Sequence, residues 1–144
     1  MDIPALPTHL RLEIVTPDRS VVADSVDEVE IPAADGYLGV LPGHTPMLAM
    51  LQIGELWYRQ GSEKHYVAIA FGFAEVLPDR VTILAELAER PDEIDIARAE
   101  AARKRAEARL TSPPPDMDFE RVRVALMKAM IRIQVSSKAR TRVN

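Results

Sequence analysis

The chain has 144 residues, of which 47% are apolar, and a formal net charge of −4. This length suits one ordinary domain or two small ones, and the apolar share excludes a globally disordered chain. The absence of cysteine excludes a disulfide scaffold and a thiolate metal site. No apolar run reaches the ~20 residues that a membrane-spanning helix needs, and residues 1–10 lack the regions of a signal peptide. We therefore expect a protein of a reducing compartment.

Charge and glycine are distributed unevenly along the chain. Residues 1–90 carry 14 acidic and 6 basic side chains, a net charge of −8, whereas residues 91–144 carry 8 and 12, a net charge of +4. All six glycines lie at or before Gly72. Because the two asymmetries coincide, we predict two domains, residues 1–90 and residues 91–144.

The first domain has the pattern of short β-strands. Residues 10–15 alternate apolar and polar side chains, and residues 29–31 continue with the same period of two. Turn-forming residues then separate 56–59 from 65–71, and a second turn separates 73–77 from 81–84. Many short strands without a helical pattern between them predict a sandwich or a barrel over about residues 8–88.

The second domain begins with an alanine-rich helix. Asp92 is the expected N-cap, because it follows Pro91 and precedes a long stretch without glycine or proline. Alanine disfavours a helix least of all residues. One face of this helix carries small and apolar side chains at steps of three and four, namely Ala99, Ala102, Ala106 and Leu110. That face lets another backbone approach closely.

Three consecutive prolines, 113–115, end this helix, and Asp116 or Asp118 can cap the next one. Apolar residues of the second helix recur in a heptad-like seam formed by Phe119, Val122, Leu126, Ala129 and Ile133. Two helices with a short connection predict an antiparallel hairpin over about residues 92–137. The basic segment 136–144 lacks periodicity, and we expect it to be frayed.

The segment 35–46 concentrates the sharpest backbone bends, with three glycines and two prolines. A phosphate-binding loop would need Gly-Lys-Ser/Thr before a helix, but Gly43 is followed by His44-Thr45-Pro46. From the residues alone, this segment is a set of turns between strands.

The stretches "DGYLGVLPGHTPML" and "GFAEVLPDRVTILAE" resemble the epsilon subunit of the bacterial-type rotary ATP synthase. The resemblance covers the chain from about Leu10 to about Val135. It implies an α+β fold with an N-terminal β-sandwich followed by a C-terminal antiparallel α-helical hairpin. It also implies a non-catalytic rotor component of the central stalk, which couples proton flow to ATP synthesis and inhibits ATP hydrolysis through its hairpin.

The resemblance further implies the partners and the location of the chain. The sandwich would bind the gamma subunit and the c-ring, and an extended hairpin would contact the catalytic alpha and beta subunits. The chain would lie at the cytoplasmic face of the bacterial plasma membrane, as a peripheral protein attached only through the complex. The residues expected to face gamma or the ring are Tyr37, Leu38, Pro42, Gly43 and His44. Tyr37 stands where relatives often carry an acid, which argues against a charged ring contact there.

A second motif implies a nucleotide site. Residues 94–99, Ile-Asp-Ile-Ala-Arg-Ala, match the family motif Ile-Asp-x-x-Arg-Ala, which in some members binds ATP in the folded hairpin. Arg98 and Arg105 share a helix face, and position 98 lies opposite about position 130. The expected site is Asp95, Arg98, Arg105, Lys128 and Arg132. ATP would be a regulatory ligand, with no cofactor required. Lys128 replaces a frequent arginine, so it lacks the planar fork that grips phosphate.

Other classes of function find little support in the sequence. His9, His44 and His65 are separated and have no partner at catalytic or metal-ligand spacing, so we predict no catalytic residue and no metal site. Basic residues of the second domain alternate with acids, which argues against nucleic acid. The alternative hypothesis is a free-standing adaptor, a β-sandwich interaction module with a helical arm and no relation to ATP synthase.

Overall fold

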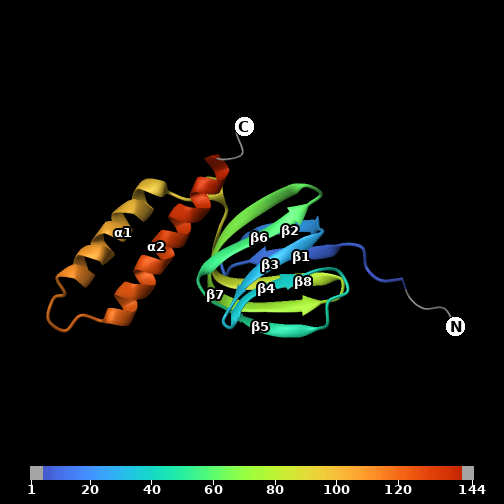
Figure 1. The fold of residues 1–144 in the computed structure, drawn as a ribbon, viewed down its shortest axis with the longest axis horizontal. Coiled ribbons are helices and arrows are strands. Elements are labelled where there is room, and N and C mark those ends of the chain that lie inside the picture. The colour runs from blue at the N-terminus through green and yellow to red at the C-terminus, as the bar shows by residue number, and fades with distance from the viewer. Residues whose placement is uncertain (1–4, 141–144) are drawn as a thin grey trace.

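Eight β-strands and two α-helices make up residues 5–140, the part of the chain that the computed structural model describes. The strands come first and the helices follow (Figure 1). The strands are β1 (Leu10–Val15), β2 (Ser20–Val26), β3 (Glu28–Ala33), β4 (Gly36–Val40), β5 (Met47–Leu51), β6 (Gly54–Gln60), β7 (Glu63–Leu77) and β8 (Arg80–Glu89). A 3-10 turn, η1 (Pro91–Glu93), leads to helices α1 (Ile96–Thr111) and α2 (Phe119–Arg140).

The strands pack as two layers that share the long strand β7. One layer runs β2-β1-β8-β7-β5, with β1 and β8 parallel and the other neighbours antiparallel. In the other layer β6 pairs with both β7 and β3, and β4 follows β3. This architecture, together with the two helices that follow, confirms the predicted β-sandwich and helical hairpin.

The core lies between the two layers and follows the predicted alternation. Leu10, Leu12 and Ile14 are fully buried, while Arg11 between them is exposed. Apolar side chains of alternating strand positions face inward from both layers, as expected for a sandwich. Other fully buried side chains of this core are Val29, Ile31, Leu56, Ile69, Val76, Val81 and Ile83.

Strand β7 changes partner in its middle. Its first half pairs with β6 as far as Ile69, and its second half pairs with β5 from Gly72 onward. Phe71 and Gly72 at this point have φ angles of 58° and 122°. A Cβ at Gly72 would lie 2.0 Å from the Leu84 carbonyl oxygen, so only glycine fits there.

Helix α1 begins three residues later than the sequence predicts. Its N-cap is Asp95, whose Oδ1 accepts a hydrogen bond of 3.0 Å from the Arg98 backbone N–H. The expected cap, Asp92, lies instead within η1. Ile94 interrupts the helix because it is extended and buried against the sandwich. Asp92 is therefore the wrong prediction for the cap, although the acid three residues on performs that role.

Helix α2 is longer than predicted at its C-terminal end. Asp118 caps it by accepting a hydrogen bond of 3.1 Å from the Arg121 backbone N–H. The helix then continues to Arg140, so the expected fraying of residues 136–140 is wrong. The reason is burial, because Val135 and Ser136 both pack in the interior. The remainder of the predicted frayed tail, residues 141–144, lies outside the described residues.

Helix α2 lies between α1 and the sandwich (Figure 1) and is buried on two sides. Val122 and Ala129 of the predicted seam are buried, as are Ala99 and Ala106 of α1, so the two helices pack through small side chains. On its other side, α2 places Ile131 and Val135 against Ala68 of β7, Ile53, Tyr66 and Ile94. Ile94 belongs to the linker between β8 and α1, residues 90–95. The hairpin is therefore docked on the sandwich. Neither helix within residues 5–140 is long and apolar enough to cross a membrane.

Candidate functional sites

A pocket of about 400 Å³ opens where the start of α1, the later part of α2 and the end of β8 meet. It contains four of the five residues predicted to bind ATP, Asp95, Arg98, Arg105 and Arg132. Ala99 and Ala102 form an uncharged part of its wall, where small side chains leave room for a ligand. The structure thus brings three arginines together from two helices, a geometry that suits a chain of phosphates.

Two carboxylates that sequence reasoning missed, Glu89 and Glu93, also line this pocket. The Glu89 Oε1 atom accepts a hydrogen bond of 2.7 Å from the Arg132 Nε atom, which fixes that arginine. Burial raises the pKa of Glu93, but hydrogen bonds from the Arg19 side chain and the Arg90 backbone outweigh it, and the pKa falls below its ordinary value of 4.5. Both acids precede the recognised motif, and only the tertiary fold brings Glu89 to Arg132.

Lys128, the fifth predicted residue, is not part of the lining of this pocket. Its Nζ atom lies over the ring of Phe71, 5.7 Å from the ring centroid. Lys128 is one helical turn from Arg132, but it contacts the bend of β7 rather than the cleft between the helices. Counting residues along the hairpin gave the right level on α2 and could not give the side to which the lysine turns.

The residues predicted to face gamma or the c-ring divide into two groups. Tyr37 and Leu38 belong to β4 and line a pocket of about 450 Å³ beside β5. Pro42, Gly43 and His44 lie in the loop after β4, at the end of the sandwich away from the hairpin (Figure 1).

Hydrogen bonds hold this loop in place. The Gly43 N–H donates to the Pro78 carbonyl at 2.7 Å, and the His44 Nδ1 atom lies 2.7 Å from the Thr45 carbonyl oxygen. Gly43 has a φ of 89°, which requires glycine at this bend. These hydrogen bonds and the bend at Gly43 therefore fix the shape of the loop. The side chain of Leu41, at the start of the loop, is 54% exposed to solvent.

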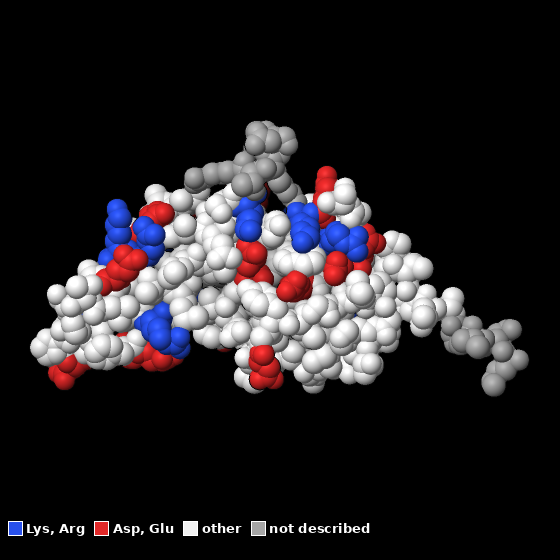
Figure 2. All heavy atoms as spheres, viewed as in Figure 1, with Lys and Arg blue, Asp and Glu red and all other residues white. Residues whose placement is uncertain are grey.

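A row of exposed apolar side chains crosses the outside of the β5-β7-β8 layer, and the sequence pattern did not reveal it. Met50 pairs with Phe73, and Phe73 pairs with Leu84 on the next strand. These three side chains are 61%, 55% and 54% exposed, and Leu48 two residues before Met50 is 75% exposed. Few charged side chains lie along the β5 edge in this view (Figure 2). We call Leu48, Met50, Phe73 and Leu84 the apolar face.

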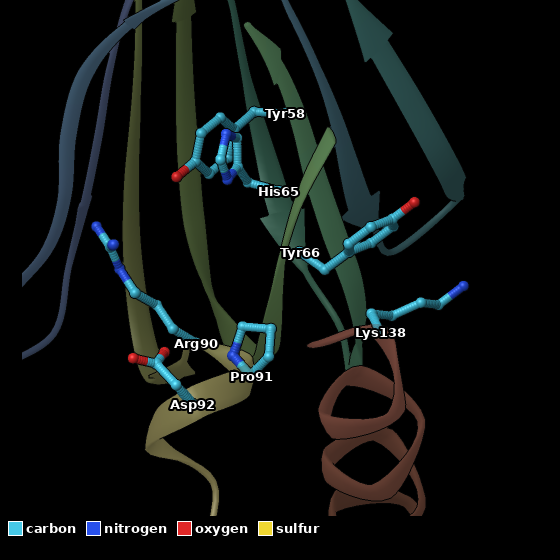
Figure 3. Close-up of a pocket in the computed structure, with 7 residues that line it drawn as sticks. All are labelled: Tyr58, His65, Tyr66, Arg90, Pro91, Asp92 and Lys138. Atoms are coloured by element: carbon cyan, nitrogen blue, oxygen red, sulfur yellow. The ribbon is translucent and has the colours of Figure 1, made fainter. Parts of the chain in front are cut away.

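Another pocket, of about 290 Å³, lies at the junction of the sandwich and the hairpin. Tyr58 and His65 stack there with ring centroids 4.9 Å apart, and the Lys138 side chain extends from α2 along the ring of Tyr66 (Figure 3). Arg90 and Pro91 of the linker complete the wall with Asp92. This pocket shows how closely the linker and the end of α2 approach the strands.

Comparison with known proteins identifies the family. The family model for the beta-sandwich domain of the ATP synthase delta/epsilon chain matches residues 9–91, and the model for its long alpha-helix domain matches residues 92–137. The chain belongs to the ATP synthase delta/epsilon family. Its relatives include ATP synthase epsilon chain 2 of Syntrophotalea carbinolica, which is 50% identical over 130 residues, 90% of this chain and 94% of that relative.

Two further matches agree. The ATP synthase epsilon chain of Koribacter versatilis is 59% identical over 104 residues, 72% of this chain and 73% of that relative. A chain of the cryo-EM structure of the Euglena gracilis mitochondrial ATP synthase, OSCP/F1/c-ring in rotational state 1, superposes with a TM-score of 0.77 at 25% identity, over 96% of this chain and 84% of that one. This chain is therefore an epsilon-type subunit of ATP synthase and not one of its catalytic subunits. Membership of this family excludes the free-standing adaptor.

Proposed function

We propose that the chain is a rotor component of the central stalk, which binds the gamma subunit and the c-ring and couples proton flow to ATP synthesis. Its family, and relatives named ATP synthase epsilon chain over 90% or more of its length, support this role. It makes and breaks no bond itself. It reaches the cytoplasmic face of the bacterial plasma membrane only as part of the complex.

The apolar face supports a specific site for the gamma subunit. Contiguous exposed apolar side chains on a folded protein commonly mark a surface for another protein. A shallow hollow of about 360 Å³ beside Phe73 and Leu84, walled by Val15 and Pro17, can accept an apolar side chain of the partner. The loop with Pro42, Gly43 and His44, at the far end from the hairpin, is the proposed contact with the c-ring.

Affinity of the purified chain for the gamma subunit tests this site. Leu84→Asp should weaken binding at least ~10-fold, because a charge would be buried in the centre of the contact. Met130→Asp is the matched control, since Met130 is equally exposed at 54% but lies on α2. Equal affinities for the two variants would show that the apolar face is not the binding site for the gamma subunit. No binding by the unaltered chain would refute the rotor role.

The hairpin is the proposed inhibitor of ATP hydrolysis. Helix α2 contacts the sandwich through a small apolar cluster, and burial stabilises by only about 25 cal/mol per Å². A helix pair held so weakly can be displaced toward the catalytic subunits. Truncation after Arg90 should leave binding to gamma intact and raise hydrolysis by the assembled complex. An unchanged rate of hydrolysis would refute the proposed inhibitory role of the hairpin and would not affect the proposed rotor role.

ATP is the proposed regulatory ligand of the pocket between the helices. Its walls come from both parts of the chain, Glu89 from the sandwich and Asp95, Arg98, Arg105 and Arg132 from the hairpin. Such a pocket exists only while the hairpin is docked, so a ligand bound there favours docking. At 100 times its dissociation constant a ligand would shift that equilibrium by about 2.7 kcal/mol.

Titration of the isolated protein with ATP tests this proposal. Arg98→Ala should lower the affinity at least ~10-fold, because it removes a charged hydrogen bond to phosphate. Arg109→Ala is the control, since Arg109 lies on the same helix outside this pocket. Lys128→Ala should also have little effect. Absence of binding at millimolar ATP would remove the nucleotide role.

A further inference from the structure

Release of the hairpin, on which this inference rests, breaks contacts that α2 makes with the sandwich. The apolar contacts are those of Ile131 and Val135 with Ala68 and Ile94. The polar contacts include the Arg132–Glu89 ion pair, the hydrogen bond of 3.4 Å from Gln134 to Glu55 and the Lys138–Glu55 ion pair at 4.0 Å. The ammonium groups of Lys128 and Lys138 also lie over the rings of Phe71 and Tyr66. Helix α1 packs mainly on α2, so it is carried along when α2 leaves.

The linker before α1 is fastened to the sandwich by different contacts. Arg90 donates from Nε and Nη2 to the Val21 carbonyl of β2, at 2.9 and 2.6 Å. Its side chain extends from the linker back along the strands (Figure 3). Val21 lies on β2, which does not pair with β8, so these hydrogen bonds fasten the linker to a second strand of the layer.

A second arginine fixes the end of the linker. Arg19, in the turn between β1 and β2, forms an ion pair with the Glu93 carboxylate and donates to the Ala88 carbonyl at 3.4 Å. Glu93 also accepts a hydrogen bond of 3.0 Å from the Arg90 backbone N–H. We call Arg19, Arg90 and Glu93 the linker clamp. Among residues 5–140, the hydrogen bonds and ion pairs of these three side chains all lie within the sandwich and linker, although η1 also packs against α2.

Only two residues separate the linker clamp from α1. Ile94 and Asp95 are both extended, with φ and ψ of −80° and 125° and of −78° and 96°. We propose that the hairpin leaves the sandwich by rotating about Ile94 and Asp95, while the clamp keeps η1 on the sandwich. The clamp therefore sets the point about which the regulatory arm turns.

This pivot divides the pocket between the helices. Glu89 and Glu93 stay with the sandwich, whereas Asp95, Arg98, Arg105 and Arg132 move with the hairpin. The cationic wall thus separates from the acidic wall at a defined peptide, between Glu93 and Asp95. A ligand that contacts both walls resists this separation, because its contacts then lie on both sides of the pivot.

Cross-linking of the full chain tests the pivot, because the absence of native cysteine leaves only the introduced pairs reactive. The pair Arg19→Cys with Glu93→Cys, joined by a short bismaleimide, locks the linker clamp. The pair Glu89→Cys with Arg132→Cys locks the docking contact. Hydrogen exchange of α2 amides reports release of the hairpin because a helix that has lost its packing on the sandwich unfolds locally more often. The uncross-linked form of each pair controls for the substitutions.

We expect the clamp cross-link to leave α2 exchange within about twofold of its uncross-linked form, and the docking cross-link to slow it at least ~10-fold. Equal slowing by both would place the pivot before Glu93 and overturn the proposal. No slowing by the docking cross-link would overturn it too, since the hairpin would not leave as a unit.

Removing the clamp provides a second measurement. Arg19→Met should let the amides of Glu93 and Ile94 exchange together with α2, whereas in the unaltered chain they exchange more slowly. Identical linker exchange in both would overturn the role of Arg19. ATP hydrolysis by the complex with the docking cross-link is measured separately. Persistent inhibition there would refute displacement as the inhibitory step, while the exchange data would still locate the pivot.

Discussion

Phe71 and Gly72 form a backbone bend on which the strand pairing of β7 and its contact with the hairpin both depend. The backbone bend at these residues lets β7 pass from β6 to β5, and Leu84 approaches Gly72 so closely that no side chain fits. Phe71 accepts a φ of 58°, which L-residues rarely adopt, and its ring receives the Lys128 ammonium group. The bend thereby supports both the apolar face and the docked hairpin.

Substitution of Gly72 by alanine should lower the free energy of unfolding by about 3 kcal/mol, because the new Cβ would overlap the Leu84 carbonyl oxygen. Gly39→Ala is the control, since a Cβ there meets nothing within 4 Å. It should change stability by less than about 0.5 kcal/mol. Urea denaturation of the two variants measures the difference, and equal midpoints would contradict the assigned overlap.

For single residues, the sequence predicted which side chains belong to the pocket better than it predicted the way each side chain turns. Helical spacing placed Arg98 and Arg105 on one face, and the length of the hairpin placed Arg132 opposite them; with Asp95, these residues line one pocket. Lys128 turned toward Phe71 because the sandwich supplies an aromatic ring that spacing on the helix cannot reveal. Glu89 was missed for the same reason, as its partner Arg132 lies 43 residues away.

The boundaries of elements depend on what they pack against. Strands β2, β4 and β5 were not predicted, because β4 lies in a segment rich in glycine and proline, and β2 and β5 lack a strict alternation of apolar and polar residues. Pairing with β3 and β7 makes them strands despite that composition. Strands β1 and β8 and the two helices were predicted, since period and proline positions are local properties of the sequence. The long strand β7 was predicted as two pieces, 65–71 and 73–77, because its continuity depends on its change of partner from β6 to β5.

The start of α1 provides the corresponding prediction. Asp95→Ala should destabilise the first turn of α1 by about 1 kcal/mol, because it removes the acceptor for the Arg98 N–H. Asp92→Ala, at the position that the sequence alone favoured, should leave α1 unchanged. Hydrogen exchange of the α1 amides in each variant distinguishes them. A larger effect at Asp92 would mean that the helix begins within η1 in solution.

On the scale of the whole molecule, the sandwich and the hairpin differ in how they are packed and share a small contact. The sandwich has a continuous core, whereas the hairpin relies on small side chains between its helices and on a few apolar contacts with the strands. We therefore expect the hairpin to open while the sandwich stays folded, as partially independent units of a protein commonly do.

Val135→Ala should weaken docking by about 2 kcal/mol, because Val135 is fully buried between α2 and the strands. Exchange of α2 amides should accelerate, with sandwich amides unaffected. Met130→Ala, five residues earlier and exposed at 54%, should change neither. Equal acceleration of sandwich amides in Val135→Ala would show that the two bodies unfold as one.

The turn between α1 and α2 also determines how far the hairpin can reach. With 16 and 22 residues at 1.5 Å each, the helices measure about 24 and 33 Å. In the docked form they lie side by side and antiparallel. Straightening of residues 112–118 would place the two spans end to end. An arm anchored beside Glu93 would then reach roughly twice the length of a single helix. The short proline-containing connection therefore determines how far from the sandwich this subunit can act.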